Sequence, residues 1–264
     1  MIQSHPGTAL ITGASSGIGA IYAERLARRG HDLILVARNR GRLNALAQRL
    51  SDETGRSVEV VIADLADRAD LARVEELLRT DASISLLVNN AGIGATRPLL
   101  ESNVDKLEEL LALNVNVLTR LTYAAVPGFV ARGGGTLINI ASIVAIAPEV
   151  LNGVYGGSKA FVLAFSQSLR HELADKNVRV QVVLPGATAT DFWGVAGTPL
   201  EYLPEAIVMK AEDMVDAALA GFDQGEFATI PALPEIADLN DYEAARQKLM
   251  PNLSMSTPAA RYRN

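Results

Sequence analysis

Short apolar runs alternate with segments of helical periodicity along the first half of the chain. The runs are short, as buried strands are, and they span residues 8–12, 32–37, 58–63 and 86–89. The segments between them carry apolar residues at three- and four-residue spacing, which predicts helices over 18–29, 42–53 and 71–78. Strands that alternate with such helices pair in parallel through right-handed crossovers. The pattern predicts an α/β fold of Rossmann type, a doubly wound, mostly parallel sheet with helices on both faces.

The alternation continues in the second half. A helical segment over 105–131 contains a Pro-Gly pair at 127–128, where we expect a kink or a break. Two further strands are predicted at 137–141 and 178–184, on either side of a helix over 155–174.

The domain organisation follows from where this pattern ends. The chain turns polar near residue 238 and carries prolines and arginines from there on. We expect a single dinucleotide-binding domain over 1–237, with a substrate lid at about 187–210, and a polar C-terminal extension over 238–264.

Composition and charge exclude several classes of site. The 264 residues include no cysteine and three histidines, which excludes disulfide scaffolds and thiol nucleophiles and argues against any metal site. The formal net charge of -6 argues against a nucleic-acid partner, because phosphate binding needs a basic surface. Residues 1–7 do not have the pattern of a leader and no apolar run approaches roughly 18 residues, so we expect a cytoplasmic protein without a membrane partner.

The segment TGASSGIG at 12–19 lies where the first predicted strand meets the first predicted helix. Gly13, Gly17 and Gly19 allow positive φ and close approach of the backbone to a pyrophosphate, and the helix N-terminus offers N–H groups and a positive dipole end. A purely structural glycine turn is the alternative. The strand before and the helix after favour a dinucleotide-binding loop.

A second group of residues indicates proton transfer. Tyr155 and Lys159 are four residues apart at the start of a helix, so their side chains project from one face. A protonated lysine favours the phenolate, so we expect the pKa of Tyr155 to fall from about 10 toward neutrality. Ser142 ends a predicted strand at the carboxyl edge of the sheet, where it can donate to a carbonyl oxygen; a capping role is its alternative.

Two further segments carry asparagine side chains. Asn114 lies in an otherwise apolar helical segment, and a buried amide among leucines needs a polar partner, either water or backbone. A structural hydrogen bond at a helix kink is the alternative to a functional role. The segment NNAG at 89–92 closes the fourth predicted strand.

In order and spacing these motifs resemble the short-chain dehydrogenase/reductase family. The resemblance covers about residues 8–230 and rests on TGASSGIG, NNAG, Asn114, Ser142, YGGSK at 155–159, and Pro185-Gly186 with Thr190. The sequence departs from the family at Thr188, where a branched aliphatic residue is usual, and at Gly156-Gly157, which replace a pair that favours helix.

The resemblance implies a hydride-transfer site with four catalytic residues. Tyr155 would donate a proton to the substrate oxygen in reduction, or accept it in oxidation. Lys159 would lower the pKa of that phenol and bind the nicotinamide ribose hydroxyls. Ser142 would hold and polarise the carbonyl, and Asn114 would fix a water that links Lys159 to solvent.

The resemblance also implies a set of cofactor contacts. The three loop glycines would cradle the pyrophosphate, Asp64 would contact the adenine and Asn90 the adenosine side. The nicotinamide would be surrounded by Ile18, Pro185, Gly186 and Thr190. Further contacts are expected from Ser15, Ser16, Arg38, Leu65, Ala91, Gly92 and Thr188, together with Tyr155 and Lys159.

The end of the second strand bears on which cofactor binds. Ala37 stands where many dinucleotide folds carry an acidic residue that accepts from the ribose 2′-OH. The absent carboxylate and the guanidinium of Arg38 favour a 2′-phosphate, with Arg40 and the Ser15 hydroxyl adding to the site, so we expect NADPH to be preferred over NADH. Arg38 as a solvated surface charge is the alternative.

The segments expected around the substrate are 92–96, 142–151 and the residues after Gly186, which are apolar with little charge. They predict a small-molecule carbonyl or secondary alcohol on an uncharged skeleton. Phe192 and Trp193 either close over the ligand or only pack against the domain.

The resemblance further implies a homodimer or homotetramer assembled through the helices around 105–131 and 155–174. The tail from about residue 238 is a candidate addition to that interface.

Taken together, the residues favour an NADPH-dependent oxidoreductase that reduces a carbonyl to a secondary alcohol with Tyr155 as general acid. An NAD-dependent alcohol dehydrogenase running toward oxidation and a non-catalytic dinucleotide-binding regulatory protein are the alternatives. Asn114, Ser142, Tyr155 and Lys159 together favour an enzyme, because a protein that only binds has no need of a proton relay.

Overall fold

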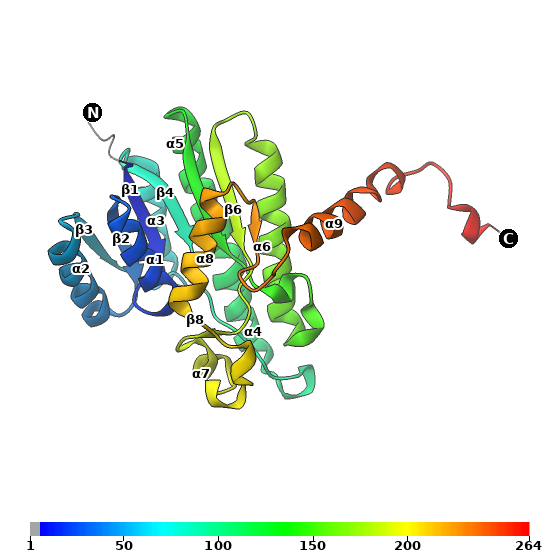
Figure 1. Ribbon diagram of the computed structural model, residues 1–264, viewed down its shortest axis with the longest axis horizontal. Coiled ribbons are helices and arrows are strands. Elements are labelled where there is room, and N and C mark those ends of the chain that lie inside the picture. The colour runs from blue at the N-terminus through cyan, green and yellow to red at the C-terminus, as the bar shows by residue number, and fades with distance from the viewer. Residues whose placement is uncertain (1–5, 264) are drawn as a thin grey trace. The chain divides into compact units, whose positions relative to one another are not determined.

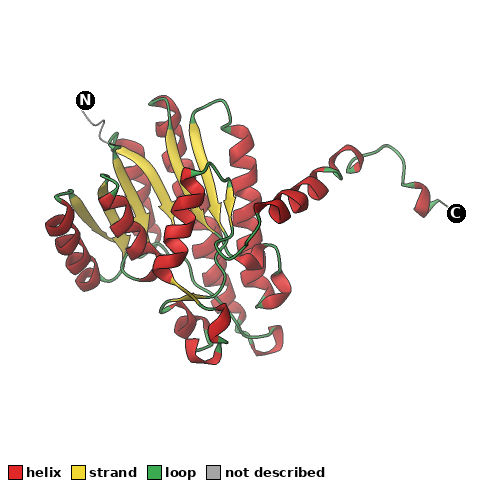
Figure 2. Cartoon of the chain, in the orientation of Figure 1, coloured by secondary structure: helices red, strands yellow, loops and turns green. Residues whose placement is uncertain are grey.

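A parallel sheet of seven strands lies at the centre of the protein, and the computed structural model describes residues 6–263 (Figures 1 and 2). His5 and most of the 1–7 segment lie outside the described residues. The strand order is β3-β2-β1-β4-β5-β6-β9, and all six pairings are parallel. The strands are β1 (Thr8–Thr12), β2 (Asp32–Ala37), β3 (Val58–Ile62), β4 (Ile84–Asn89), β5 (Gly135–Ile140), β6 (Val178–Val183) and β9 (Ala228–Thr229). The predicted Rossmann-type fold is confirmed.

Helices cover both faces of the sheet. One layer consists of α1 (Gly17–Arg28), α2 (Arg40–Thr54) and α8 (Ala211–Asp223), and the other of α3 (Arg68–Thr80), α5 (Leu118–Ala131) and α6 (Gly153–Glu172) (Figure 1). Side chains alternate between the layers along each strand: Ala9 and Ile11 pack under the first layer, and Leu10 packs under the second. This two-sided burial explains the continuous apolar sequences of the inner strands β1 and β2.

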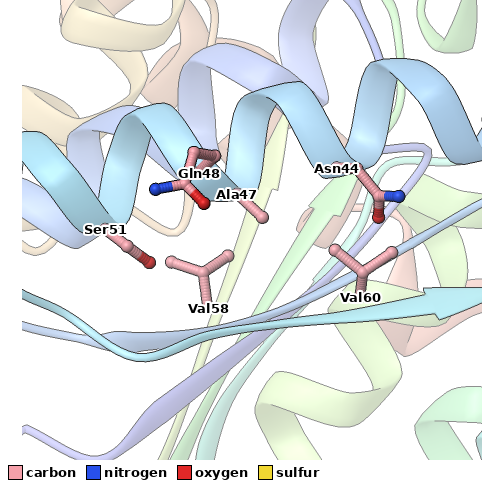
Figure 3. A pocket seen from close by; sticks show the side chains of 6 residues that line it. All are labelled: Asn44, Ala47, Gln48, Ser51, Val58 and Val60. Carbon is pink, nitrogen blue, oxygen red and sulfur yellow. The ribbon is translucent and has the colours of Figure 1, made fainter.

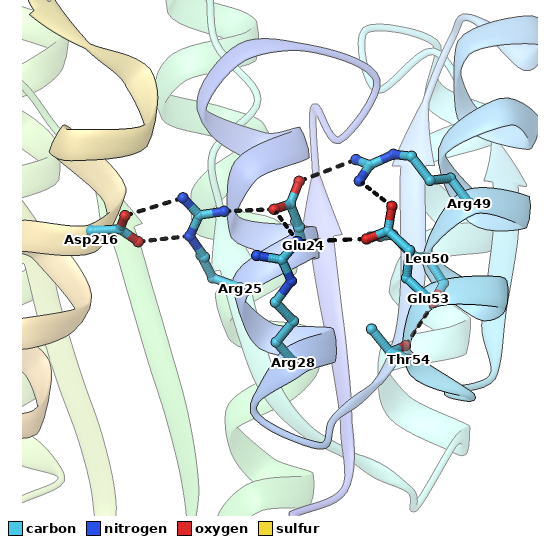
Figure 4. A network of polar contacts seen from close by, with 8 residues as sticks. All are labelled: Glu24, Arg25, Arg28, Arg49, Leu50, Glu53, Thr54 and Asp216. Carbon is cyan, nitrogen blue, oxygen red and sulfur yellow. Dashed lines mark hydrogen bonds and ion pairs between the residues drawn. The ribbon is translucent and has the colours of Figure 1, made fainter.

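Ion pairs connect the three helices of the first layer (Figure 4). Glu24 on α1 accepts from Arg25 of the same helix and from Arg49 on α2. Arg25 also donates to Asp216 on α8 through two nitrogens, at 2.7 and 3.1 Å. The Glu24 carboxylate is largely buried, so its contacts join α1 and α2 more firmly than an exposed pair does, whereas the pair with Asp216 is exposed.

The helical segment predicted over 105–131 is interrupted, but not at the Pro-Gly pair. It consists of α4 (Val104–Leu111), a π-helical stretch (Ala112–Val117) and α5, which runs through Pro127 to Ala131. The expected break at Pro127 is therefore wrong. The irregular turn surrounds Asn114, whose side chain bonds the backbone of a neighbouring loop, and such π turns are typical of functional sites.

Several short elements follow β6. The lid segment contains α7 (Phe192–Ala196), and it is bracketed by a two-stranded parallel sheet of β7 (Thr188–Ala189) and β8 (Met209–Lys210). Single 3₁₀ turns occur at Leu99–Glu101, Ile143–Ala145, Pro148–Val150, Leu200–Tyr202, Glu205–Ile207, Met250–Asn252 and Ala260–Tyr262.

The chain divides into two compact units, one ending at Pro231 and one beginning at Ala232. The second unit contains α9 (Ile236–Gln247), whose side chains within that helix are all at least partly exposed. No helix within residues 6–263 is both long and apolar enough to cross a membrane.

A shallow hollow lies between α2 and β3, at the edge of the sheet (Figure 3). Its lining is formed by Asn44, Ala47, Gln48, Ser51, Val58 and Val60. None of the predicted site residues is among them.

Candidate active site

The sheet reverses its winding direction between β1 and β4, which are neighbours although two strands separate them in sequence. Ligands of open α/β sheets bind beyond the carboxyl ends of the strands at such a switch point. Thr12 joins the two strand ends there: its hydroxyl donates to Val88 O at 3.2 Å and accepts from the amides of Asn90 and Ala91, both at 3.0 Å. The glycine loop and the NNAG segment are thus connected by one side chain.

The glycine loop has the backbone that a pyrophosphate requires. Gly13 and Gly17 have φ of +67° and +53°, in the left-handed region. A Cβ at Gly19 would lie 2.5 Å from Asn90 Nδ2 and 2.9 Å from the carbonyl carbon of Gly13, so only glycine allows α1 to start so close to the loop. Ser16 makes no side-chain capping bond to the first turn of α1. The loop therefore fits a bound dinucleotide phosphate, which the first-turn N–H groups can hold.

Arg38 and Asp64 meet beyond the ends of β2 and β3. Arg38 Nη1 lies 3.8 Å from Asp64 Oδ2, and the Arg38 side chain is 76% exposed. Ala37, the last residue of β2, is buried and offers no carboxylate. Leu65 is buried in the core with Leu10, so a contact of this residue with a ligand would have to come from its backbone.

Tyr155, Lys159 and Ser142 converge from α6 and from the end of β5. Tyr155 and Lys159 are both buried, and Lys159 Nζ donates to Ile140 O at 2.9 Å. The same nitrogen lies 5.9 Å from the centroid of the Tyr155 ring. The Ser142 hydroxyl donates to Pro185 O at 3.3 Å, which connects β5 to the segment after β6.

Burial controls the ionisation of both α6 residues. It raises the pKa of Tyr155 to about 12, against a smaller lowering by the Ser142 hydroxyl. It lowers the pKa of Lys159 from 10.5 to about 8. The expectation that Lys159 brings the pKa of Tyr155 toward neutrality is therefore wrong for this structure, because desolvation dominates and the ammonium bonds Ile140 O instead of the phenol. The phenol is protonated at neutral pH.

The side-chain amide of Asn114 has the polar partners that a buried amide among apolar residues needs. Its Oδ1 accepts from Ile93 N at 2.9 Å, and its Nδ2 donates to Ile93 O at 2.8 Å and to Ser158 Oγ at 3.2 Å. Gly92 separates this amide from Lys159: a Cβ there would lie 3.0 Å from Asn114 Oδ1 and 3.7 Å from Lys159 Nζ.

Of the residues expected around a nicotinamide, Ile18 lies in the first turn of α1 and the others lie along the segment after β6. Thr190 faces the glycine loop, where a Cβ at Gly17 would lie 3.1 Å from its methyl group. Pro185 O accepts from the amide of Ile143 at 3.0 Å. Thr188 is buried, and its carbonyl accepts from Trp193 Nε1 at 2.9 Å.

The unusual glycine pair of α6 is explained in part. A Cβ at Gly156 would lie 2.9 Å from Pro148 Cβ, so close packing against the preceding 3₁₀ turn requires glycine there. Gly157 has no such neighbour, and nothing in the structure explains it.

Some contacts at the site had no recognisable sequence signal. The Ile140 carbonyl that holds Lys159 is a backbone group, and the contact of Gly94 with the Phe192 ring joins residues far apart in sequence. Thr12 lies inside the glycine motif at the end of a predicted strand. Its position could therefore have identified its hydroxyl as a contact of the site.

The buried Lys159 gives a stability prediction. Its pKa is lower in the folded chain, so between about pH 8 and 10.5 the unfolded chain holds more protons and stability rises with pH; above about pH 10 the raised pKa of Tyr155 reverses this trend. We expect Lys159→Met to stabilise the protein at pH 7 by roughly 1–3 kcal/mol and to lose the rise between pH 8 and 10. Urea denaturation at pH 7 and 9.5 measures both effects.

The exposed Lys106 provides the matched control, because Lys106→Met removes a lysine that remains in water. If Lys159→Met had unchanged stability and the wild-type dependence of stability on pH, burial of the Lys159 ammonium would not lower the stability of the protein, and the prediction would be wrong.

Comparison with known proteins agrees with this geometry. The profile of the short chain dehydrogenase family matches residues 7–199. A short-chain dehydrogenase from Sphingobium yanoikuyae in complex with NADPH is 51% identical, with a TM-score of 0.94 over 97% of this chain and 100% of that one. A bulky-bulky ketone specific alcohol dehydrogenase from Comamonas testosteroni is 45% identical, with a TM-score of 0.90 over 99% and 100% of the two chains.

A human 17-beta-hydroxysteroid dehydrogenase type 3 is 34% identical over 209 residues, which are 78% of this chain and 64% of that protein. The chain spans about 60% of the length of the first vertebrate relatives that it matches. The chain belongs to the short-chain dehydrogenase/reductase family of NAD(P)-dependent oxidoreductases.

Proposed function

We propose that the protein is an NADPH-dependent carbonyl reductase that converts a ketone on an apolar or uncharged skeleton into a secondary alcohol. The observation that carries the proposal is the convergence of a protonated phenol, a serine hydroxyl and a buried lysine at the switch point of the sheet, beside a loop that fits a dinucleotide. The NADPH-bound Sphingobium relative and the ketone-specific Comamonas relative support it.

Each residue takes one role in this reaction. A dinucleotide held by the glycine loop would supply the hydride. Ser142 donates a hydrogen bond to the substrate carbonyl oxygen, and Tyr155 donates the proton that this oxygen needs as it becomes a hydroxyl. Lys159 binds the ribose hydroxyls. Asn114 keeps the loop at Ile93 in place, and a water that it would fix would link Lys159 to solvent.

The preference for NADPH rests on charge at the end of β2. Arg38 is exposed and lies beside Asp64, and the position before it is an alanine. A guanidinium there binds a 2′-phosphate, and no carboxylate on β2 accepts from a 2′-OH. Gly13, Gly17 and Gly19 form the pyrophosphate side of this proposed site, the Ser15 hydroxyl adds to the 2′-phosphate side, Ser16 is a further contact, and Ile18 belongs to the nicotinamide side.

The apolar substrate class rests on the side chains around Tyr155. Leu110 and Val144 are buried in one cluster with Tyr155, and the partly buried Ile93, Leu151 and Phe192 pack against this cluster. Apolar surroundings of this kind disfavour charged substituents, because a buried charge without a partner is costly.

A carbonyl panel assayed with NADPH and with NADH tests the proposal. We expect turnover of hydrophobic ketones with NADPH at least tenfold above NADH. Turnover only of alcohols with NAD⁺ would favour an oxidising alcohol dehydrogenase. Cofactor binding without turnover of any carbonyl or alcohol would favour a regulatory binding protein.

We also propose that the chain assembles with copies of itself. Exposed apolar side chains on three helices support this: Val104 on α4, Tyr123 on α5 and Phe161 on α6. Light scattering of the intact protein is expected to give two or four chain masses, and the mass of one chain would contradict the proposal.

A further inference from the structure

The ring of Phe192 lies directly against the backbone of Gly94, next to the phenol of Tyr155. A Cβ at Gly94 would overlap the ring at Cζ and lie 2.7 Å from Cε2 and 2.9 Å from Cε1. The ring centroids of Phe192 and Tyr155 are 5.9 Å apart, with 46° between the planes. The ring therefore takes up volume beside the phenol that the proposed function assigns to the substrate carbonyl.

The position of this ring is set by its neighbour in α7. Trp193 is buried, donates from Nε1 to Thr188 O at 2.9 Å, and meets the Phe192 ring edge-on with centroids 5.6 Å apart. An edge-to-face pair at this distance is a favourable aromatic arrangement. Phe192 is itself only partly buried, so it borders open space on one side.

Polar contacts fix the lid on both sides of Phe192. Beyond it, Thr96 donates its hydroxyl to Ala196 O at 2.9 Å, and the hydroxyls of Thr96 and Thr198 are 2.9 Å apart. Before it, Arg42 on α2 donates to Asp191 at 2.9 Å. These contacts hold α7 in a defined place over the loop that contains Gly94.

We infer that Phe192 is a specificity-determining residue whose ring limits the size of one substituent on the reacting carbonyl, and that Gly94 provides the space in which the ring stands. The inference rests on the proposed ketone reduction. It assigns as substrates apolar ketones in which one substituent is slender enough to fit beside the Phe192 ring at the Tyr155 phenol.

Two single variants and their combination test the inference. Phe192→Ala is expected to raise the ratio of kcat/KM for a ketone with two bulky groups over that for its methyl ketone at least tenfold, because one added group in an apolar pocket changes discrimination by about 10- to 200-fold. Gly94→Ala is expected to lower kcat/KM for the best wild-type ketone at least tenfold, since the methyl group displaces the ring. In the Phe192→Ala background the same substitution is expected to cost less than about twofold.

Gly194 provides the matched control, because it lies in the same short helix and a Cβ there meets no atom within 4 Å. Gly194→Ala is expected to leave both kcat/KM values unchanged. An equal cost of Gly94→Ala in both backgrounds, or an unchanged size ratio in Phe192→Ala, would overturn the inference. Phe192→Leu provides a milder second variant, with a smaller shift of the ratio expected in the same direction.

A binding measurement separates this inference from the proposed function. Trp193 is the only tryptophan of the chain, so its emission reports on the surroundings of Phe192. Titration of the NADP⁺-loaded protein with the two ketones is expected to show that Phe192→Ala strengthens binding of the bulky ketone relative to the methyl ketone. If no carbonyl is turned over but this shift occurs, the proposed reaction fails and the role of Phe192 stands. Turnover of ketones with no such shift would overturn the role of Phe192 and leave the proposed reaction standing.

Discussion

Replacing Tyr155 with phenylalanine is expected to lower kcat for ketone reduction by about a thousandfold while the dissociation constant for NADPH changes less than about twofold. The phenol is buried, and desolvation keeps it protonated with a pKa of about 12, so it is a proton donor in its resting state. Removing a positioned general acid costs about 10²- to 10⁴-fold in rate. The ring that packs against Leu110 and Val144 remains, so the site keeps its shape. Single-turnover kinetics with a hydrophobic ketone measures the loss.

Tyr123 on α5 provides the matched control, because its phenol is exposed and its ring stacks on Phe165 without nearing the site. Tyr123→Phe is expected to retain wild-type turnover. Full activity in Tyr155→Phe would show that another group supplies the proton, whereas loss of NADPH binding would show that the phenol holds the cofactor instead of acting on the substrate.

Replacing Arg38 with alanine is expected to weaken NADPH binding by about 10- to 100-fold and to leave NADH binding nearly unchanged. A hydrogen bond to a charged group contributes about 1.5–3 kcal/mol, which corresponds to this range. The substitution also leaves Asp64, 3.8 Å from the guanidinium in the wild-type protein, without its cationic neighbour beside the incoming phosphate. Fluorescence titration with the two nucleotides measures both affinities.

Arg263 lies in the second unit, so Arg263→Ala controls for the loss of one positive charge alone. Equal losses for NADPH and NADH in Arg38→Ala would remove the basis for the cofactor preference. Such equal losses would indicate that Arg38 stabilises the structure at the end of β2 and does not recognise a 2′-phosphate.

The first two strands were predicted well because both are buried on two sides. The predicted strands at 8–12 and 32–37 coincide with β1 and β2 in the structure. The last strand, Ala228–Thr229, has two residues and forms only through pairing with β6, so no local pattern marks it. The helix α8 was missed although Met214, Val215, Ala218 and Leu219 have helical spacing, a signal that was present in the sequence.

The candidate site could be located from motifs, but the ionisation of its residues could not be predicted from them. The types and spacing of Tyr155 and Lys159 were visible in the sequence, whereas the pKa of each depends on how completely the fold removes water from it. The contact of Phe192 with Gly94 was likewise invisible, because it depends on how the lid folds back over a loop from the first half of the chain.

The link between α1 and α8 has a consequence for how the chain is made. Asp216 follows Arg25 by 191 residues, so during synthesis the outer surface of α1 stays uncovered until nearly the whole first unit has emerged. The apolar residues that α8 places on this layer, among them Met214 and Leu219, lie beyond residue 199, where the family profile stops matching. A polypeptide that ended at that residue would carry every proposed catalytic group and still lack the cover of its own first helix.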